Sequence, residues 1–222
     1  MKLKKIASLA LAGVMAVSML AGCSNKGGAS SEGQNDEPTG INAAAVIAAL
    51  DKDTTKNVTF SADAGLQATA DKLATSVESG LGNVKFDLKN LNKIDEDINS
   101  TSTYLAEVKT GSKDNSASTD MKAQTVTFVV NASKLIGAND SAIVKELAAG
   151  IDKAGVYTNG AGMNALPEEG KTYKDSNTSE SYKFTFKYTA GVAVVGTTAD
   201  NGQTTYYAVV SLTRTPTRVA VD

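Results

Sequence analysis

Residues 182–213 read YKFTFKYTAGVAVVGTTADNGQTTYYAVVSLT, and this stretch gives the strongest indication of the fold. Its first seven residues place an aromatic side chain at every second position, with Lys or Thr between, which is typical of a strand with one buried face. Two further β-rich segments, 192–198 and 203–213, flank Asn201-Gly202, a dipeptide that favours the tight turn of a hairpin. The stretch therefore predicts an antiparallel meander of strands 182–189, 192–198 and 203–213.

Apolar residues with helical spacing upstream predict three helices that cover this sheet. The helices are expected from 43 to about 51, from about 64 to a C-cap at Gly80, and from about 140 to 155. Each follows a residue that is favourable as an N-cap. These residues are Asn42 for the first helix, Ser61 or Asp63 for the second, and Asn139, Asp140 or Ser141 for the third.

Other segments predict further strands. Residues 57–60 and 101–109 are rich in β-forming residues, and the apolar run 125–130 predicts a strand buried on both faces. Segment 83–99 allows two interpretations, because its start alternates like a strand while 88–94 has helical spacing.

These elements indicate an α+β fold in one domain over 41–222. We expect an antiparallel sheet with a C-terminal meander, covered by the N-terminal and central helices. An α-β-α sandwich is one arrangement that this pattern allows.

The N-terminal segment has the parts of a secretory signal peptide. Lysines 2, 4 and 5 precede an apolar run over 6–19, which is shorter than the ~20 residues of a permanent membrane span. The run ends in Leu20-Ala21-Gly22-Cys23, which resembles the lipobox of bacterial lipoproteins. Small residues at Ala21 and Gly22 would let an extended backbone enter a peptidase site. We therefore expect residues 1–22 to be removed and Cys23 to carry lipid.

Residues 23–40 are expected to be a lipidated N-terminus followed by a disordered linker. The segment after Cys23 reads SNKGGASSEGQNDEPTG and has no apolar residue larger than alanine, so it cannot bury surface. It would act as a flexible tether between a membrane lipid and the domain. The expected location is the extracytoplasmic face of the cell membrane.

The composition excludes several classes of function. Three lysines lie in the first 22 residues, which leaves 19 basic and 24 acidic side chains beyond them, a net charge of −5. With only two arginines and no basic cluster, we expect no nucleic-acid partner. The chain has no histidine and one cysteine, which removes histidine-dependent catalysis and the usual zinc and iron–sulfur sites. We predict no catalytic residue, no cofactor and no metal site.

Three weaker patterns have a plain alternative interpretation. Glu168-Glu169 could supply part of a carboxylate pair, but neighbours in a turn usually face water. Asp95, Asp97 and Asn99 have the first spacings of a calcium loop, yet the glycine and terminal glutamate of that loop are missing. The aromatic row of strand 182–189, together with Tyr206 or Tyr207 on the neighbouring hairpin strand, could be a ligand platform, although such rows usually belong to the core.

Two parts of the chain resemble the CAP superfamily of SCP-like extracellular domains. Segments 48–52 and 60–74 look like the opening helices of that family, and 188–195, 201–202 and 205–210 are similar to its closing hairpin. The resemblance implies an α-β-α sandwich with the hairpin central. It carries over no functional residue, because the histidines of the family's cleft have no counterpart here.

These observations predict a membrane-anchored lipoprotein of the bacterial envelope whose domain binds a ligand or partner without catalysis. Its partners would be the membrane, through the lipid, and an envelope polymer, a small ligand or a protein. The alternatives are a degenerate CAP-like domain and a cell-wall hydrolase that uses carboxylates.

Overall fold

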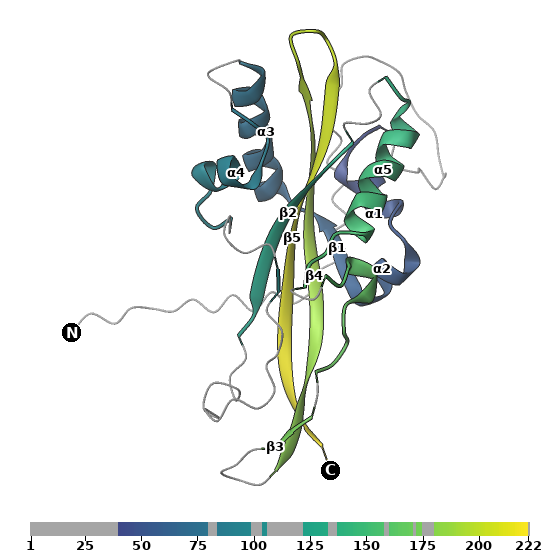
Figure 1. Cartoon of the computed structure of the whole chain (residues 1–222), viewed down its shortest axis with the longest axis vertical. Helices are drawn as coiled ribbons and strands as arrows, with labels where there is room; N and C mark the ends of the chain where they lie inside the picture. The colour runs from purple at the N-terminus through teal and green to yellow at the C-terminus, as the bar shows by residue number, and fades with distance from the viewer. Residues whose placement is uncertain are drawn as a thin grey trace, which may run out of the picture. The chain divides into compact units, whose positions relative to one another are not determined.

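One long hairpin forms the centre of the structure. Strands β4 (Ser181–Thr198) and β5 (Thr204–Val221) pair antiparallel over their whole length, from Ser181 opposite Val221 to Thr198 opposite Thr204 (Figure 1). The computed structural model describes residues 40–79, 84–98, 104–105, 122–132, 137–157, 160–170, 172–174 and 180–221. The expected signal peptide, Cys23 and nearly all of the expected linker lie outside these ranges, as does most of the strand expected at 101–109.

The predicted three-strand meander is wrong at one point, because segments 182–189 and 192–198 form a single strand. β4 continues through Ala190 and Gly191 without a turn. Gly191 serves a close approach instead, since a Cβ there would lie 2.7 Å from the Oδ2 atom of Asp63. The turn expected at Asn201-Gly202 is present, and Gly202 has the positive φ of 77° that such a turn needs.

β5 also extends beyond its expected end at Thr213, through Pro216 to Val221. Ala199 donates its N–H to Gln203 O at 2.9 Å, so odd-numbered residues of β5 bond to β4 and even-numbered ones face the other edge. The strand β2 on that edge begins opposite Arg214. The N–H that proline lacks would point to this other edge, where Pro216 has no partner strand. The ladder to β4 therefore continues past Pro216.

The sheet is mixed. β1 (Val58–Ala62) runs parallel to β4, and β2 (Gln124–Asn131) runs antiparallel to β5, which gives the order β1-β4-β5-β2. The two-residue strand β3 (Tyr173–Lys174) pairs with the start of β4. β1 and β2 confirm the strands expected near 57–60 and 125–130.

Five α-helices lie in the described ranges, and most begin where the sequence predicts. Asn42, Asp63 and Asn139 are the N-caps of α1 (Ala43–Ala48), α3 (Ala64–Glu78) and α5 (Asp140–Asp152). α4 (Leu88–Ile94) resolves the ambiguous segment in favour of a helix. The expected C-cap Gly80 is outside the described residues.

Helix α2 (Lys52–Asn57) has no counterpart among the sequence expectations. Its residues are polar, but the side chain of Asp51 accepts the N–H of Asp53 at 3.0 Å and starts the helix. α1 consequently ends at Ala48 rather than near 51. A short 3₁₀-helix, η2 (Met163–Ala165), follows later in the chain.

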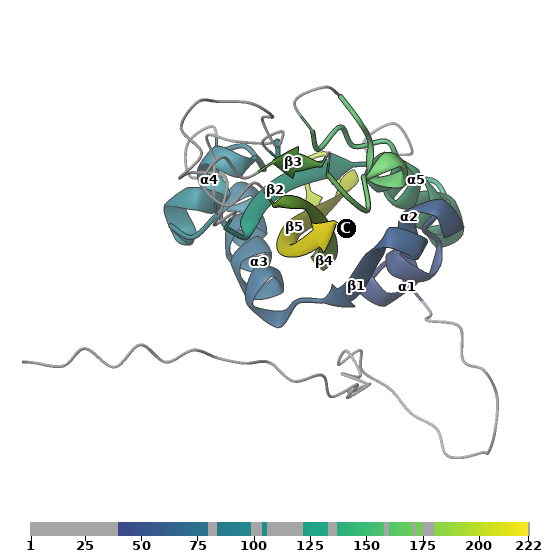
Figure 2. The same cartoon turned by 90° about the horizontal axis from the view of Figure 1, so that it is seen from below.

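The fold is α+β, with helices on both faces of the sheet. Figure 2 shows α3 and α4 on one side of the hairpin and α1, α2 and α5 on the other. Alternate residues of β4 enter the two cores: Val192 and Val194 pack with α1 and α5, and Ala193 packs with α3 and α4. The helices over 43–48 and 64–78 thus enclose the hairpin as an α-β-α sandwich. Within the described ranges, no helix is long and apolar enough to cross a membrane.

A third, smaller cluster stabilises the far end of the hairpin. It contains Tyr173 of β3 with Tyr182 and Phe184 of β4, whose rings pack 5.6–6.3 Å apart. The guanidinium of Arg218 lies 4.0 Å from the centre of the Tyr182 ring. This end has no helix in contact with it among the described residues, so aromatic packing supplies its apolar burial.

Candidate functional site

Glu168 and Glu169 each form a separate ion pair with a lysine at the surface. Glu168 lies 3.8 Å from the ammonium of Lys56, and Glu169 pairs with Lys183. Both glutamate side chains are more than half exposed, at 68% and 55%. Each carboxylate thus has its own lysine in solvent, which is unlike the facing carboxylates of a hydrolase cleft.

The Asp95–Asp97 turn closes helix α4. Asp95 is the C-cap residue, and its carboxylate accepts the N–H of Asp97 at 3.1 Å and the hydroxyl of Thr69 at 3.5 Å. Asn99 and the later positions of the calcium-like spacing are outside the described residues. Among those described, no group of three or more acidic or cysteine side chains is arranged to hold a metal ion.

The aromatic row of β4 belongs to the core. Tyr182, Phe184 and Tyr188 are 2–3% exposed, and Phe186 is half-buried against them. The core interpretation of this row is confirmed, and its rings offer no platform to a ligand.

A buried polar network lies where the row meets β5. Arg214 donates from Nη1 to the hydroxyl of Tyr157 at 2.8 Å, and that hydroxyl lies 2.9 Å from the hydroxyl of Tyr188. Tyr188 donates to the carbonyl of Pro167 at 2.9 Å, so its single proton is used and Tyr157 must be the donor between the two tyrosines. Hydrogen bonds therefore run in one direction, from the arginine through both tyrosines to the loop.

The buried position of this network affects the ionisation of Tyr188. Burial raises the pKa of Tyr188 well above its ordinary value of 10.0, against a lowering by the charge of Arg214. Arg214 is only 2% exposed and lies 5.1 Å from the centre of the Phe186 ring. The network holds loop 155–167 on the sheet, and we assign it a structural role.

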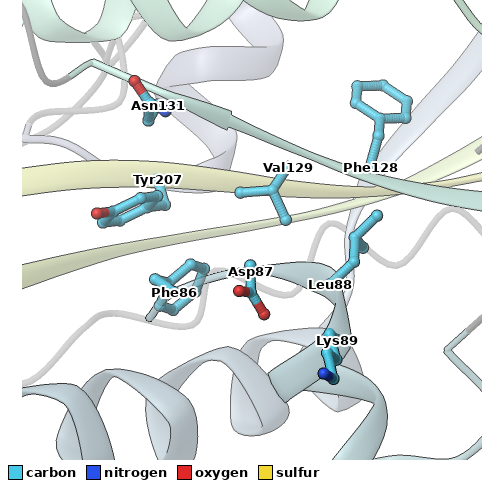
Figure 3. A pocket seen from close by; sticks show the side chains of 8 residues that line it. All are labelled: Phe86, Asp87, Leu88, Lys89, Phe128, Val129, Asn131 and Tyr207. Atoms are coloured by element: carbon cyan, nitrogen blue, oxygen red, sulfur yellow. The ribbon is translucent and has the colours of Figure 1, made fainter. Parts of the chain in front are cut away.

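An open groove lies between the start of α4 and the outer strand β2. Its volume is about 540 Å³, within the ~300–1,000 Å³ of typical ligand sites. Four consecutive residues before and in α4 line one wall, and β2 and β5 line the other (Figure 3). These residues are Phe86, Asp87, Leu88 and Lys89 on the first wall, and Phe128, Val129, Asn131 and Tyr207 on the second.

The groove has a fixed apolar wall and a polar rim. The rings of Phe86 and Tyr207 stack with centres 4.4 Å apart, which links the segment before α4 to β5. Asp87 accepts the N–H of Asn90 at 2.9 Å as the N-cap of α4, so its position is fixed as well. Asp87 is the only carboxylate among the lining residues, which fits binding rather than two-carboxylate hydrolysis.

Sequence reasoning missed this groove. Its residues come from segments 86–89, 128–131 and 207, which only the sheet order brings together. The possible ligand platform included Tyr207, which does line the groove. A further local signal was Asp87, an N-cap that would have resolved segment 83–99 as a loop followed by a helix. The predicted lipobox residues Leu20, Ala21, Gly22 and Cys23 lie outside the described ranges.

No family model, no curated protein and no solved structure matches this chain.

Proposed function

We propose that this chain is a lipid-anchored lipoprotein on the extracytoplasmic face of a bacterial cell membrane, with a non-catalytic binding domain. The observation that carries the proposal is Leu20-Ala21-Gly22-Cys23 at the end of a basic and apolar leader. The sole cysteine stands at the one position where a lipobox requires it. The polar segment that follows supplies a spacer to the domain.

The domain supports a binding role through its groove. The groove combines an apolar wall with a carboxylate, an ammonium and an amide at its rim, a mixture typical of ligand sites. Neither the Glu168-Glu169 pair nor the groove brings two carboxylates together, so nothing described favours the hydrolase alternative. The occupant would be a small ligand, an envelope polymer or a protein.

A second candidate is a degenerate CAP-like domain. The observation that favours it is the position of the hairpin between α1 and α3, the arrangement that the resemblance implied. This candidate is compatible with the anchor and with a binding role, because the catalytic-type histidines of that family are absent from this sequence.

The anchor is tested by replacing the sulfur atom. We expect the full chain, made in a bacterial host, to sediment with membranes and to yield a Cys23 N-terminal peptide bearing diacylglycerol. Cys23→Ser should remain unlipidated and lose firm membrane retention, because the acyl chains supply ~0.8 kcal/mol per buried CH₂.

Ser31→Ala in the linker is the matched control and should fractionate like the parent chain. Mass spectrometry that finds a free Cys23 thiol, or an intact leader on the purified parent chain, contradicts the proposal.

A further inference from the structure

We propose that the groove beside β2 binds an extended peptide segment of a partner protein, which adds to the sheet as a further strand. The inference rests on the binding role proposed above and narrows it to one class of ligand. It does not depend on the anchor, so fractionation and peptide binding can fail separately.

The groove lies along the outer edge of the sheet. β2 is the last strand in the order β1-β4-β5-β2, and β5 occupies its inner edge. Phe128 packs in the core with α1 and α5, whereas Val129 packs on the opposite face, toward α3 and α4. Both residues line the groove, and Figure 3 shows the Phe128 ring on the side of β2 away from Asp87. A hollow that touches both faces of a strand opens on the edge of that strand.

The backbone of Val129 at this edge points away from the rest of the sheet. Ala132, just beyond β2, donates its N–H to Tyr206 O at 2.9 Å in the same register as the β2–β5 ladder. In an antiparallel ladder, only every second residue of a strand hydrogen-bonds to the neighbouring strand. The backbone groups of even-numbered β2 residues therefore point to β5, and Val129 directs its N–H and C=O outward. Within the described part of the chain, no hydrogen bond reaches these two groups of Val129.

This arrangement matches the chemistry of a polypeptide. An extended peptide offers an N–H and a C=O from the same residue, which can pair with both groups of Val129. Its next side chain would face Leu88 and Val129, and the one after would face the Phe128 side. Asp87 and Lys89 at the rim can form ion pairs with basic and acidic side chains of the peptide, respectively.

A second copy of this chain fits the edge less well. Segment 86–89 stands beside β2 as the other wall of the groove. If two copies paired through β2, segment 86–89 of one copy would lie against segment 86–89 of the other, whereas a single peptide strand needs only the groove. A dimer is therefore the competing outcome that the experiment must detect.

The experiment selects nine-residue peptides from a random display library on the immobilised full chain. The enriched peptide is then synthesised with N-methyl groups on one or the other set of alternate amides, because only one set faces β2 in an added strand. We expect one methylated form to lose at least about tenfold in affinity and the other to bind like the parent peptide.

Val129→Pro removes the outward N–H without touching the ladder to β5. It should weaken the peptide at least about tenfold, whereas Thr125→Pro, a position of the same parity outside the groove, should not. Thermal unfolding checks that both variants fold, and the methylated peptides decide the question on the parent chain if one does not.

Three results would overturn the inference. The first is a library with no peptide that prefers the parent chain to Val129→Pro, and the second is equal loss with both methylated forms. The third is a concentration-dependent dimer of the parent chain that Val129→Pro dissolves, which would assign the edge to a second copy.

Discussion

The two halves of the β4–β5 hairpin share one hydrogen-bond ladder but have different neighbours. In the central half, Val192, Ala193 and Val194 are buried in succession, because helices cover both faces. In the distal half, Tyr182 and Phe184 are buried while Lys183 between them remains partly exposed. The change from continuous to alternating apolar residues therefore marks the point where the covering helices end, although the strand itself continues.

The difference predicts that the halves unfold separately, and two core truncations test this. Leu212→Ala in the central half should lower the free energy of global unfolding by about 2–5 kcal/mol, because it leaves a cavity between packed layers. Phe184→Ala should leave the urea midpoint of the helix signal nearly unchanged and speed hydrogen exchange in 181–187 and 215–221. Equal shifts of that midpoint would show that the hairpin unfolds as one unit.

Alkaline pH should distinguish the halves through their tyrosines. Burial raises the pKa of both Tyr188 and Tyr173 above 10.0, so the folded protein keeps protons that the unfolded chain releases. The stability they contribute is complete below pH 10 and is lost as pH rises above it, by about 1.4 kcal/mol per pH unit for Tyr188.

Urea unfolding between pH 8 and 11.5, followed by the helix signal, measures this slope. Tyr188→Phe should reduce it by one proton, whereas Tyr173→Phe in the distal cluster should not change it. A slope that Tyr173→Phe reduces equally would couple the two halves.

The smallest effect is expected at the hairpin turn. Gly202→Ala should cost about 1–2 kcal/mol, because its φ of 77° is unfavourable for a residue with a Cβ, although no atom lies within 4 Å of that Cβ. Asp200→Ala at the same tip is the control and should change the unfolding free energy by less than about 0.5 kcal/mol. If the control costs as much, backbone conformation is not the cause.

Local sequence signals predicted the elements well and their continuity poorly. Asn42, Asp63 and Asn139 cap helices because capping depends on the next three residues alone. The sequence predicted a break between strands near Gly191, because the contact that requires glycine there is with the carboxylate of Asp63, 128 positions away. The last strand was expected to end at Thr213, and its continuation past Pro216 depends on where β2 begins.

The groove was out of reach of sequence reasoning for the same reason. Asp87 could be assigned as a cap, but the stacking of Phe86 on Tyr207 joins residues from distant parts of the chain. The outward direction of the Val129 backbone follows from the register with β5, which no local pattern encodes.

The sheet order also sets when the protein can fold during its synthesis. β1 and β2 hydrogen-bond only to β4 and β5 within the described sheet, so neither has a partner until residues 181–221 have been made. Before then the described helices can form, but β1 and β2 cannot join this sheet, and the helix faces that pack on it have no sheet to cover. Such an order would suit the export that the proposed signal peptide implies, because the sheet is completed only when its last two strands have been made.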